Sequence, residues 1–210
     1  MSLYKTIHFN ASSQVYVWQI EETYKDLFDG VVLTDKSLLR LSGMKSEMQQ
    51  RAFLSVRKLL QHIGYTDFDL YYDNSGKPHL HDGRHISITH SFEFSAIIIS
   101  DATTGIDIEK LRDKIMLIAD KFADSEFEYL DRMAEEYVMK LTVIWGIKEA
   151  IFKIRNEKGI SFKEHIKVDS FEVWDHCCKA ELHFGNVIVD YNIYFTEIEN
   201  YILVYAFEKN

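Results

Sequence analysis

Two carboxylates lie two positions apart in TGIDIEKLRDK (residues 104–114), a segment whose pattern is typical of a half-buried β-strand. Side chains alternate between the two faces of a strand, so we expect Asp107 and Glu109 on one face and their isoleucine neighbours on the other. Two like charges at this spacing repel unless a cation or a proton lies between them. The pair therefore marks a candidate site for binding a cation or a proton.

A third carboxylate lies in WGIKEAIFK (residues 145–153), where the apolar pattern predicts a long helix. Glu149 and Lys153 are four residues apart and Trp145 comes one turn earlier, so the three share a helix face. Such a Glu–Lys pair is commonly a surface ion pair, but Trp145 and Phe152 indicate a covered face. If the strand described above lies against this helix, three carboxylates converge. That donor set suits Mg²⁺ together with water and phosphate oxygens.

Basic side chains in the first half of the chain are less informative singly. Lys77 lies in the turn NSGKPHL and His90 ends the predicted strand ISITHS. A lone lysine in a turn is usually solvated, and neither standard glycine-rich nucleotide loop is present. The mixed spacing of three further histidines in a predicted hairpin favours a surface cluster over a metal site: His79, His81 and His85.

The composition predicts a folded protein, since 47% of the 210 residues are hydrophobic and 14% are aromatic. The net charge of −9 argues against nucleic-acid binding. No apolar run approaches the length of a membrane span, and the first residues lack the apolar region of a secretory signal. Cys177 and Cys178 are adjacent, a spacing that favours two reduced thiols. We therefore expect a cytoplasmic protein with no membrane or nucleic-acid partner.

The element pattern predicts an α+β fold with two halves, residues 1–102 and 103–210, each having a long helix packed on a small antiparallel sheet. The helices are expected at 46–64, where Ser46 can cap the start and Gly64 the end, and at about 134–155. Arg51 and Arg57 lie off the apolar stripe of the first helix and are expected to face solvent or a ligand. Strands are expected at 12–20, 68–73, 85–90, 94–100, 105–109, 170–175, 179–184, 187–195 and 201–208.

The motifs GKP, SITHS, GIDIE and WGIKEAIFK occur in this order. Together they resemble the 4′-phosphopantetheinyl transferase superfamily, and in particular its longer, surfactin-synthetase-type enzymes. The likeness runs from about residue 45 to 155, and the last two motifs are complete and the most specific. Thr89 stands where the family usually has serine, a change that retains the hydroxyl.

The resemblance implies a pseudo-twofold α+β fold that holds coenzyme A and Mg²⁺ between two similar halves. It also implies transfer of 4′-phosphopantetheine from coenzyme A to a serine of an apo acyl or peptidyl carrier protein, with release of adenosine 3′,5′-bisphosphate. Asp107, Glu109 and Glu149 correspond to the family's metal ligands. Glu149 is also placed to help remove the serine proton, and Lys153 to neutralise phosphate charge near the reacting centre.

The same resemblance implies contacts with coenzyme A by Arg51, Lys77, Thr89, His90, Lys148 and Lys153. The basic stretch KIRNEKGISFKEHIK (residues 153–167) is either a docking patch for an acidic carrier protein or a solvated loop. A monomer is the simplest expectation, because two fused halves already form the binding region.

Two other functions stay open on the residues alone. One is a Mg²⁺-dependent hydrolase that cleaves the pyrophosphate of coenzyme A or a related nucleotide with water. The other is a catalytically silent module that binds coenzyme A. The carrier protein and its pathway are not indicated by the sequence.

Overall fold

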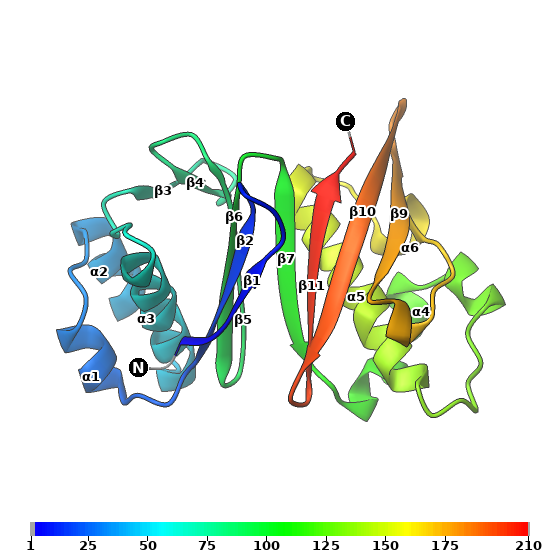
Figure 1. Ribbon diagram of the computed structural model, residues 1–210, viewed down its shortest axis with the longest axis horizontal. Helices are drawn as coiled ribbons and strands as arrows, with labels where there is room; N and C mark the ends of the chain where they lie inside the picture. Colours follow the sequence, from blue (N-terminus) through cyan, green and yellow to red (C-terminus); the bar gives the residue numbers. More distant parts are fainter. Residues whose placement is uncertain (1–2, 210) are drawn as a thin grey trace. The chain divides into compact units, whose positions relative to one another are not determined.

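The computed structural model describes residues 3–209 and divides the chain into two compact units, Met1–Ala102 and Thr103–Asn210. Each unit combines a long helix with an antiparallel sheet (Figure 1). The α+β class predicted from the sequence is therefore confirmed. Between residues 3 and 209, no helix has both the length and the apolar character needed to cross a membrane.

The N-terminal unit has a four-stranded antiparallel sheet in the order β1-β2-β6-β5. Its strands are β1 (Leu3–His8), β2 (Gln14–Gln19), β5 (His85–Ser91) and β6 (Phe94–Ser100). Three helices lie beside this sheet (Figure 1): α1 (Tyr24–Asp29), α2 (Asp35–Ser42) and α3 (Glu47–His62). A small separate hairpin is formed by β3 (Leu70–Tyr72) and β4 (Pro78–Leu80).

Helix α3 begins and ends where the sequence pattern predicts. Ser46 occupies the N-cap position, although its side chain makes no capping hydrogen bond. Gly64 follows the last turn with a φ of +88°, a conformation that glycine adopts without steric cost. The buried face is broader than the predicted stripe, because it also includes Phe53, Leu54 and Leu59.

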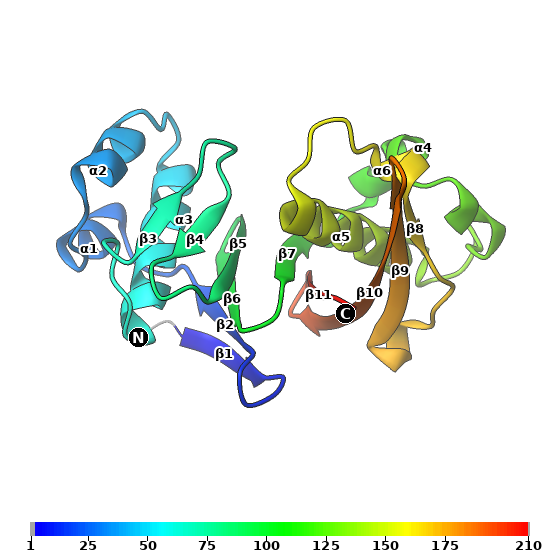
Figure 2. The same ribbon diagram turned by 90° about the horizontal axis from the view of Figure 1, so that it is seen from above.

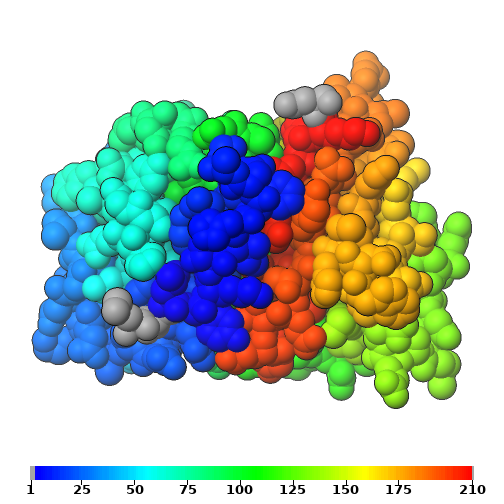
Figure 3. Space-filling view, in the orientation of Figure 1, coloured from blue at the N-terminus to red at the C-terminus, as the bar shows by residue number. Residues whose placement is uncertain are grey.

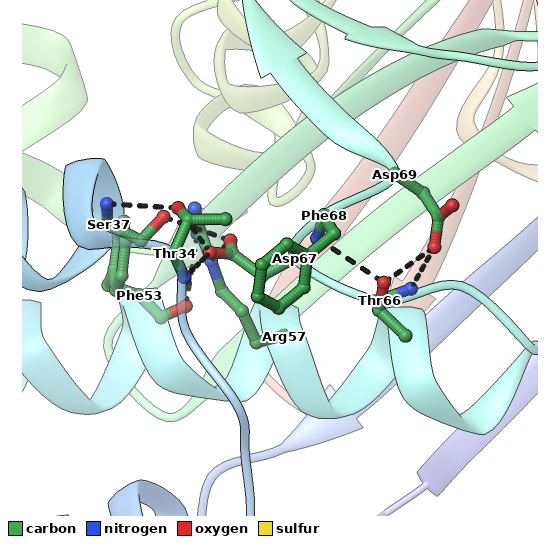
Figure 4. A network of polar contacts seen from close by, with 8 residues as sticks. All are labelled: Thr34, Ser37, Phe53, Arg57, Thr66, Asp67, Phe68 and Asp69. Carbon is green, nitrogen blue, oxygen red and sulfur yellow. Dashed lines mark hydrogen bonds and ion pairs between the residues drawn. The ribbon is translucent and has the colours of Figure 1, made fainter.

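Arg57 is a correction to the sequence analysis, since its side chain is only 3% exposed. Its Nε donates to Asp67 Oδ1 at 3.0 Å, and its guanidinium lies 3.5 Å from the centre of the Phe53 ring (Figure 4). Asp67 also accepts hydrogen bonds from Thr34 and Ser37 at the start of α2. Arg57 therefore joins α2 and α3 rather than facing solvent or a ligand.

The C-terminal unit has a five-stranded antiparallel sheet in the order β7-β11-β10-β9-β8. Its strands are β7 (Thr104–Lys110), β8 (Ile166–Val168), β9 (Cys177–Phe184), β10 (Val187–Ile198) and β11 (Tyr201–Glu208). The helices α4 (Ala119–Phe122), α5 (Tyr137–Arg155) and α6 (Phe162–His165) lie on one side of it (Figure 2). Residues of β10 and β11 form part of the surface seen in orange and red in Figure 3.

Residues 170–175 are a second correction, because they include a 3₁₀ turn, η3 (Val173–Asp175), in place of the predicted strand. Two further 3₁₀ turns, η1 (Asp113–Leu117) and η2 (Ser125–Glu128), flank α4. The short elements α1, α2, β1, β4 and β8 had no clear sequence signal. Cys177 and Cys178 are both free thiols, as predicted.

Both units share one chain path. In each, one strand precedes the long helix in the chain, and the last strand of the unit returns to pair antiparallel with it: β6 with β2, and β11 with β7. The preceding strand, β5 or β10, pairs with that last strand on its other side. The order of elements predicted from the sequence therefore corresponds to a repeated topology.

Two glycines permit α5 to lie unusually close to β7 and β11. A Cβ at Gly105 on β7 would be 2.1 Å from the carbonyl oxygen of Ala150. A Cβ at Gly146 on α5 would be 2.8 Å from Cγ2 of Val204 on β11. Neither distance is compatible with a side chain, so the helix–sheet spacing depends on both residues.

Gly105→Ala is expected to lower the free energy of unfolding by about 1–3 kcal/mol, because the added methyl group must displace the α5 backbone. Chemical denaturation measures this change. The control is Gly43→Ala, where the nearest atom would be 3.5 Å from the new Cβ and φ is −78°. Equal stability losses in the two variants would contradict the close-approach argument.

Candidate active site

The three carboxylates predicted from the sequence come together where β7 faces α5. Gly105, Asp107 and Glu109 alternate with the isoleucines along β7, and Gly105 lies directly against the backbone of α5. Asp107 is opposite Val204 in the β7–β11 ladder and is only 4% exposed. Glu149 is on α5, one residue before Ala150, whose carbonyl faces Gly105. The close helix–sheet contact thus places acids from both elements in one region.

Lys153 and Trp145 contact these acids directly. Lys153 Nζ donates to Asp107 Oδ1 at 2.7 Å and to the carbonyl of Ile106 at 2.9 Å. The indole nitrogen of Trp145 donates to Glu109 Oε1 at 3.2 Å. The helix face that bears Trp145 and Lys153 is therefore covered by β7, and Lys153 forms its ion pair with Asp107 of the strand rather than the expected pair with Glu149 of its own helix.

The surroundings of Glu109 and Glu149 disfavour their ionised forms. Burial, together with the negative charge of Asp107, raises the pKa of Glu109 to about 7. Burial and the same charge also raise the pKa of Glu149, while the Lys153 ammonium acts in the opposite direction. The repulsion expected from the sequence is thus present, and one lysine does not balance it.

No three His, Cys, Asp or Glu side chains within residues 3–209 form a ready-made metal-holding group. The carboxylates are close enough to perturb one another, but Asp107 is engaged by Lys153 and Glu109 by Trp145. The assignment of these three acids as metal ligands stays a prediction.

Lys148 does not have the environment expected of a ligand contact. Its side chain is 0% exposed and lies 2.7 Å from Glu126 Oε1, an oxygen of a side chain that is 1% exposed. Its ammonium also donates to the carbonyls of Phe122, Phe162 and Ile166 at 2.7–3.1 Å. The structure thus offers no surface of Lys148 to coenzyme A. This lysine instead ties α4, η2, α6 and β8 to α5.

The residues of the N-terminal unit that were predicted to contact coenzyme A lie on different elements: a turn, strand β5 and helix α3. The backbone N–H of Lys77 donates to Asp73 Oδ1 at 3.0 Å, which shapes the turn that presents it. Thr89 is 5% exposed, whereas His90 is exposed, as expected for adjacent residues on opposite faces of β5. Arg51 donates to the carbonyls of Glu22 and Ile20 at 2.8 and 2.9 Å. Their roles stay predictions.

The nearby histidines fit a surface cluster. His79 and His81 both stack on the ring of Tyr71, and His79 also lies 3.0 Å from Asp73 Oδ2. These are contacts within the β3–β4 hairpin. The sequence-based preference for a surface cluster over a metal site agrees with them.

The basic stretch 153–167 is partly neutralised by acids of its own unit. The pairs are Lys153–Asp107, Arg155–Glu157 and Lys163–Asp124. The Lys163 pair is 3.7 Å long and solvent-exposed, so it is weak. A basic docking patch here would consist mainly of residues beyond Lys153 and Arg155.

Comparison with known proteins adds independent information about this unit. Residues 103–203 match the family model described as the 4′-phosphopantetheinyl transferase superfamily. The C-terminal unit is therefore similar to this superfamily over nearly its whole length. The matched region contains the GIDIE and WGIKEAIFK motifs, whereas GKP and SITHS precede it.

Two curated relatives support the same assignment. The chain is 32% identical over 94 residues to 4′-phosphopantetheinyl transferase psf-1 of Bacillus pumilus, covering 43% of this chain and 40% of the relative. It is 33% identical over 98 residues to 4′-phosphopantetheinyl transferase gsp of Aneurinibacillus migulanus, covering 46% and 39%. The matched part thus spans about two fifths of each relative's length. The superfamily resemblance inferred from the motifs is confirmed.

The sequence pattern did not indicate two features of the C-terminal unit. One is Glu126, which lies in a 3₁₀ turn with no periodic pattern. The other is a cavity of about 280 Å³ beside the carboxylates. Its lining residues are Glu109, Lys110, Arg112, Lys114, Ile115, Ile118, Thr142 and Trp145. Lys110, Arg112 and Lys114, which directly follow GIDIE, were the sequence feature that could have indicated this cavity.

Lys148→Met is expected to lower the free energy of unfolding by about 3–5 kcal/mol, because it leaves the buried Glu126 carboxylate without its cation. Denaturant titration measures the loss. Lys163→Met is the control, since its ion pair with Asp124 is long and exposed. A Lys148→Met protein as stable as the Lys163→Met protein would contradict the structural role.

Replacing Glu109 with Gln is expected to change how stability depends on pH. A carboxyl whose pKa is raised on folding stabilises the protein when protonated, and this contribution is lost as pH rises from about 4.5 to about 7. The unfolding free energy of the wild type, minus that of Glu109→Gln, should therefore fall across this window. Glu149 and Asp107 are present in both proteins, so the difference reports the Glu109 carboxyl together with its interaction with these two acids. Thermal unfolding at several pH values measures this difference. A difference that stays constant or rises with pH would contradict a raised pKa of Glu109.

Proposed function

We propose that this protein transfers the 4′-phosphopantetheine group of coenzyme A to a serine hydroxyl of an apo acyl or peptidyl carrier protein, with Mg²⁺ as cofactor. The released product is adenosine 3′,5′-bisphosphate. The observation that supports this most is the grouping of Asp107, Glu109 and Glu149 around Lys153 within a unit of the transferase superfamily.

The donor set fits Mg²⁺ by its chemistry. All three groups are carboxylates, the ligand type that this ion prefers. The raised pKa values of Glu109 and Glu149 show that negative charge is crowded and poorly solvated here. We assign Asp107, Glu109 and Glu149 as the residues that would hold the ion. When bound, Mg²⁺ supplies positive charge that stabilises the phosphoanhydride oxygens as the bond breaks.

Glu149 and Lys153 have distinct roles in the proposed reaction. Burial and the charge of Asp107 raise the pKa of Glu149, and a carboxylate with a raised pKa is a stronger base when ionised. We assign it the serine proton, taken directly or through water. Lys153 is partly exposed while its ammonium holds Asp107, so it fixes one carboxylate and contributes positive charge towards a phosphate.

We assign contacts with the phosphates of coenzyme A to the N-terminal unit, through Lys77, His90 and Arg51. Arg51 already donates two hydrogen bonds to backbone carbonyls, which holds its guanidinium in place. The Thr89 side chain is buried, so its contact in this proposal is through the backbone. Lys148 is omitted because its ammonium is enclosed.

The carrier-protein partner is inferred from the transferase family, and the basic stretch 153–167 is the proposed docking region. Opposite local charges would favour docking of an acidic carrier despite the net charge of −9. A cytoplasmic location, a monomeric state and the absence of nucleic-acid or membrane partners stay predictions.

Glu149→Gln is expected to reduce transfer by about 10²–10⁴-fold, because it removes the proposed base and one metal ligand while retaining the side-chain shape. The assay incubates the protein with coenzyme A, Mg²⁺ and several apo carrier proteins, and measures the mass gained by each carrier. Glu197→Gln, at an exposed position on β10 outside the proposed docking region, is the control and should retain activity.

The same assay separates the alternative functions. Release of adenosine bisphosphate without any gain in carrier mass would indicate the hydrolase. Absence of turnover with every carrier would indicate the silent binding module. Full activity in Glu149→Gln would reject the role assigned to this residue.

A further inference from the structure

The indole of Trp145 is placed to control the orientation of one carboxylate. Its N–H donates to Glu109 Oε1 at 3.2 Å. Trp145 and Glu149 are one helical turn apart on α5, while Glu109 comes from β7. The hydrogen bond therefore connects an acid of the strand to the helix that provides the other acid.

The ring of Trp145 is itself held by aromatic contacts. It meets Phe122 edge-on with the ring centres 5.2 Å apart, and Phe162 at a tilt with the centres 5.5 Å apart. The residue is half-buried, and its remaining surface lines the cavity beside Glu109. A ring fixed in this way offers a donor with little rotational freedom.

A glutamate carboxylate has three rotatable bonds between it and the backbone, so an unrestrained side chain loses conformational entropy when it binds a cation. A hydrogen bond to one oxygen removes part of that freedom in advance. Groups that orient metal ligands in this way commonly affect metal affinity by about 10–100-fold when they are removed.

We propose that Trp145 is a positioning residue, whose indole N–H holds the Glu109 carboxylate in an orientation suited to binding a divalent cation. This inference rests on the proposed function, because it takes Glu109 as a ligand. It goes beyond it in assigning a role to a residue that touches neither substrate nor cation.

The alternative is that Trp145 only fills space among Phe122 and Phe162. Trp145→Phe distinguishes the two roles, because it retains an aromatic ring but cannot donate a hydrogen bond. A closer match in shape is benzothienylalanine at position 145, in which sulfur replaces the indole N–H. Tyr129→Phe is the matched control: it removes a hydrogen bond to the Val168 carbonyl in the same unit, away from the carboxylates.

The experiment measures Mn²⁺ binding to the full-length protein by calorimetry and by electron paramagnetic resonance. We expect Trp145→Phe and the benzothienylalanine protein to bind Mn²⁺ about 10-fold more weakly than the wild type, with Tyr129→Phe unchanged. In the transfer assay, the Mg²⁺ concentration for half-maximal rate should rise by a similar factor. The rate at saturating Mg²⁺ should stay within about twofold of the wild type, because no reacting group is removed.

Wild-type Mn²⁺ affinity in the benzothienylalanine protein would overturn the positioning role while leaving the proposed function intact. A fall in the rate at saturating Mg²⁺ with unchanged Mn²⁺ affinity would also overturn it. Failure of the wild-type protein to bind Mn²⁺ would instead reject the metal site itself, and the inference with it.

Discussion

The candidate site depends on one steric constraint, the close approach of α5 to the sheet at Gly105 and Gly146. At these two positions the backbones of α5 and the sheet are nearer than a Cβ atom permits, and this places the strand acids and the helix acid in one region. Removing the Cβ atom at both positions achieves this, at the cost of the extra chain entropy that glycine loses on folding. The carboxylates are therefore brought together by residues that have no chemistry of their own.

The close packing buries like-charged carboxylates beside one another, and their repulsion is only partly offset by neighbouring groups. Lys153 binds Asp107, Trp145 donates to Glu109, and the pKa of Glu109 rises to about 7. Lys148, the neighbouring residue on α5, is a buried charge that has a full set of partners. Lys148 is one position, and thus about 100° of helix rotation, from Glu149, and its charge is fully matched by Glu126 and three carbonyls. The Lys148 charge is thus satisfied within the unit, whereas Glu109 and Glu149 keep raised pKa values.

Local pattern predicted the acids well, because it depends on short-range geometry. Alternation along 105–109 and four-residue spacing along 145–153 are enough to assign faces, and the order of motifs indicated the superfamily. The burial of Arg57 and Lys148 was not predictable in this way, since their partners, Asp67 and Glu126, lie in non-periodic segments far along the chain. Residues 170–175 have apolar and aromatic residues typical of a strand, yet their last part forms a 3₁₀ turn before β9.

The shared topology of the two units shows which features belong to the fold and which to the site. In both, the last strand returns to pair with the strand that precedes the long helix in the chain. Yet where β7 presents Gly105, Asp107 and Glu109 towards α5, β2 contributes Tyr16 and Trp18 to the apolar core around α3. The strand that precedes the long helix therefore contributes aromatic side chains to the core in the N-terminal unit, where β7 carries a glycine and two acids. The same chain path thus carries an apolar core in one unit and a group of buried acids in the other, so the acidic character of the candidate site follows from the residues on β7 and α5, not from the fold alone.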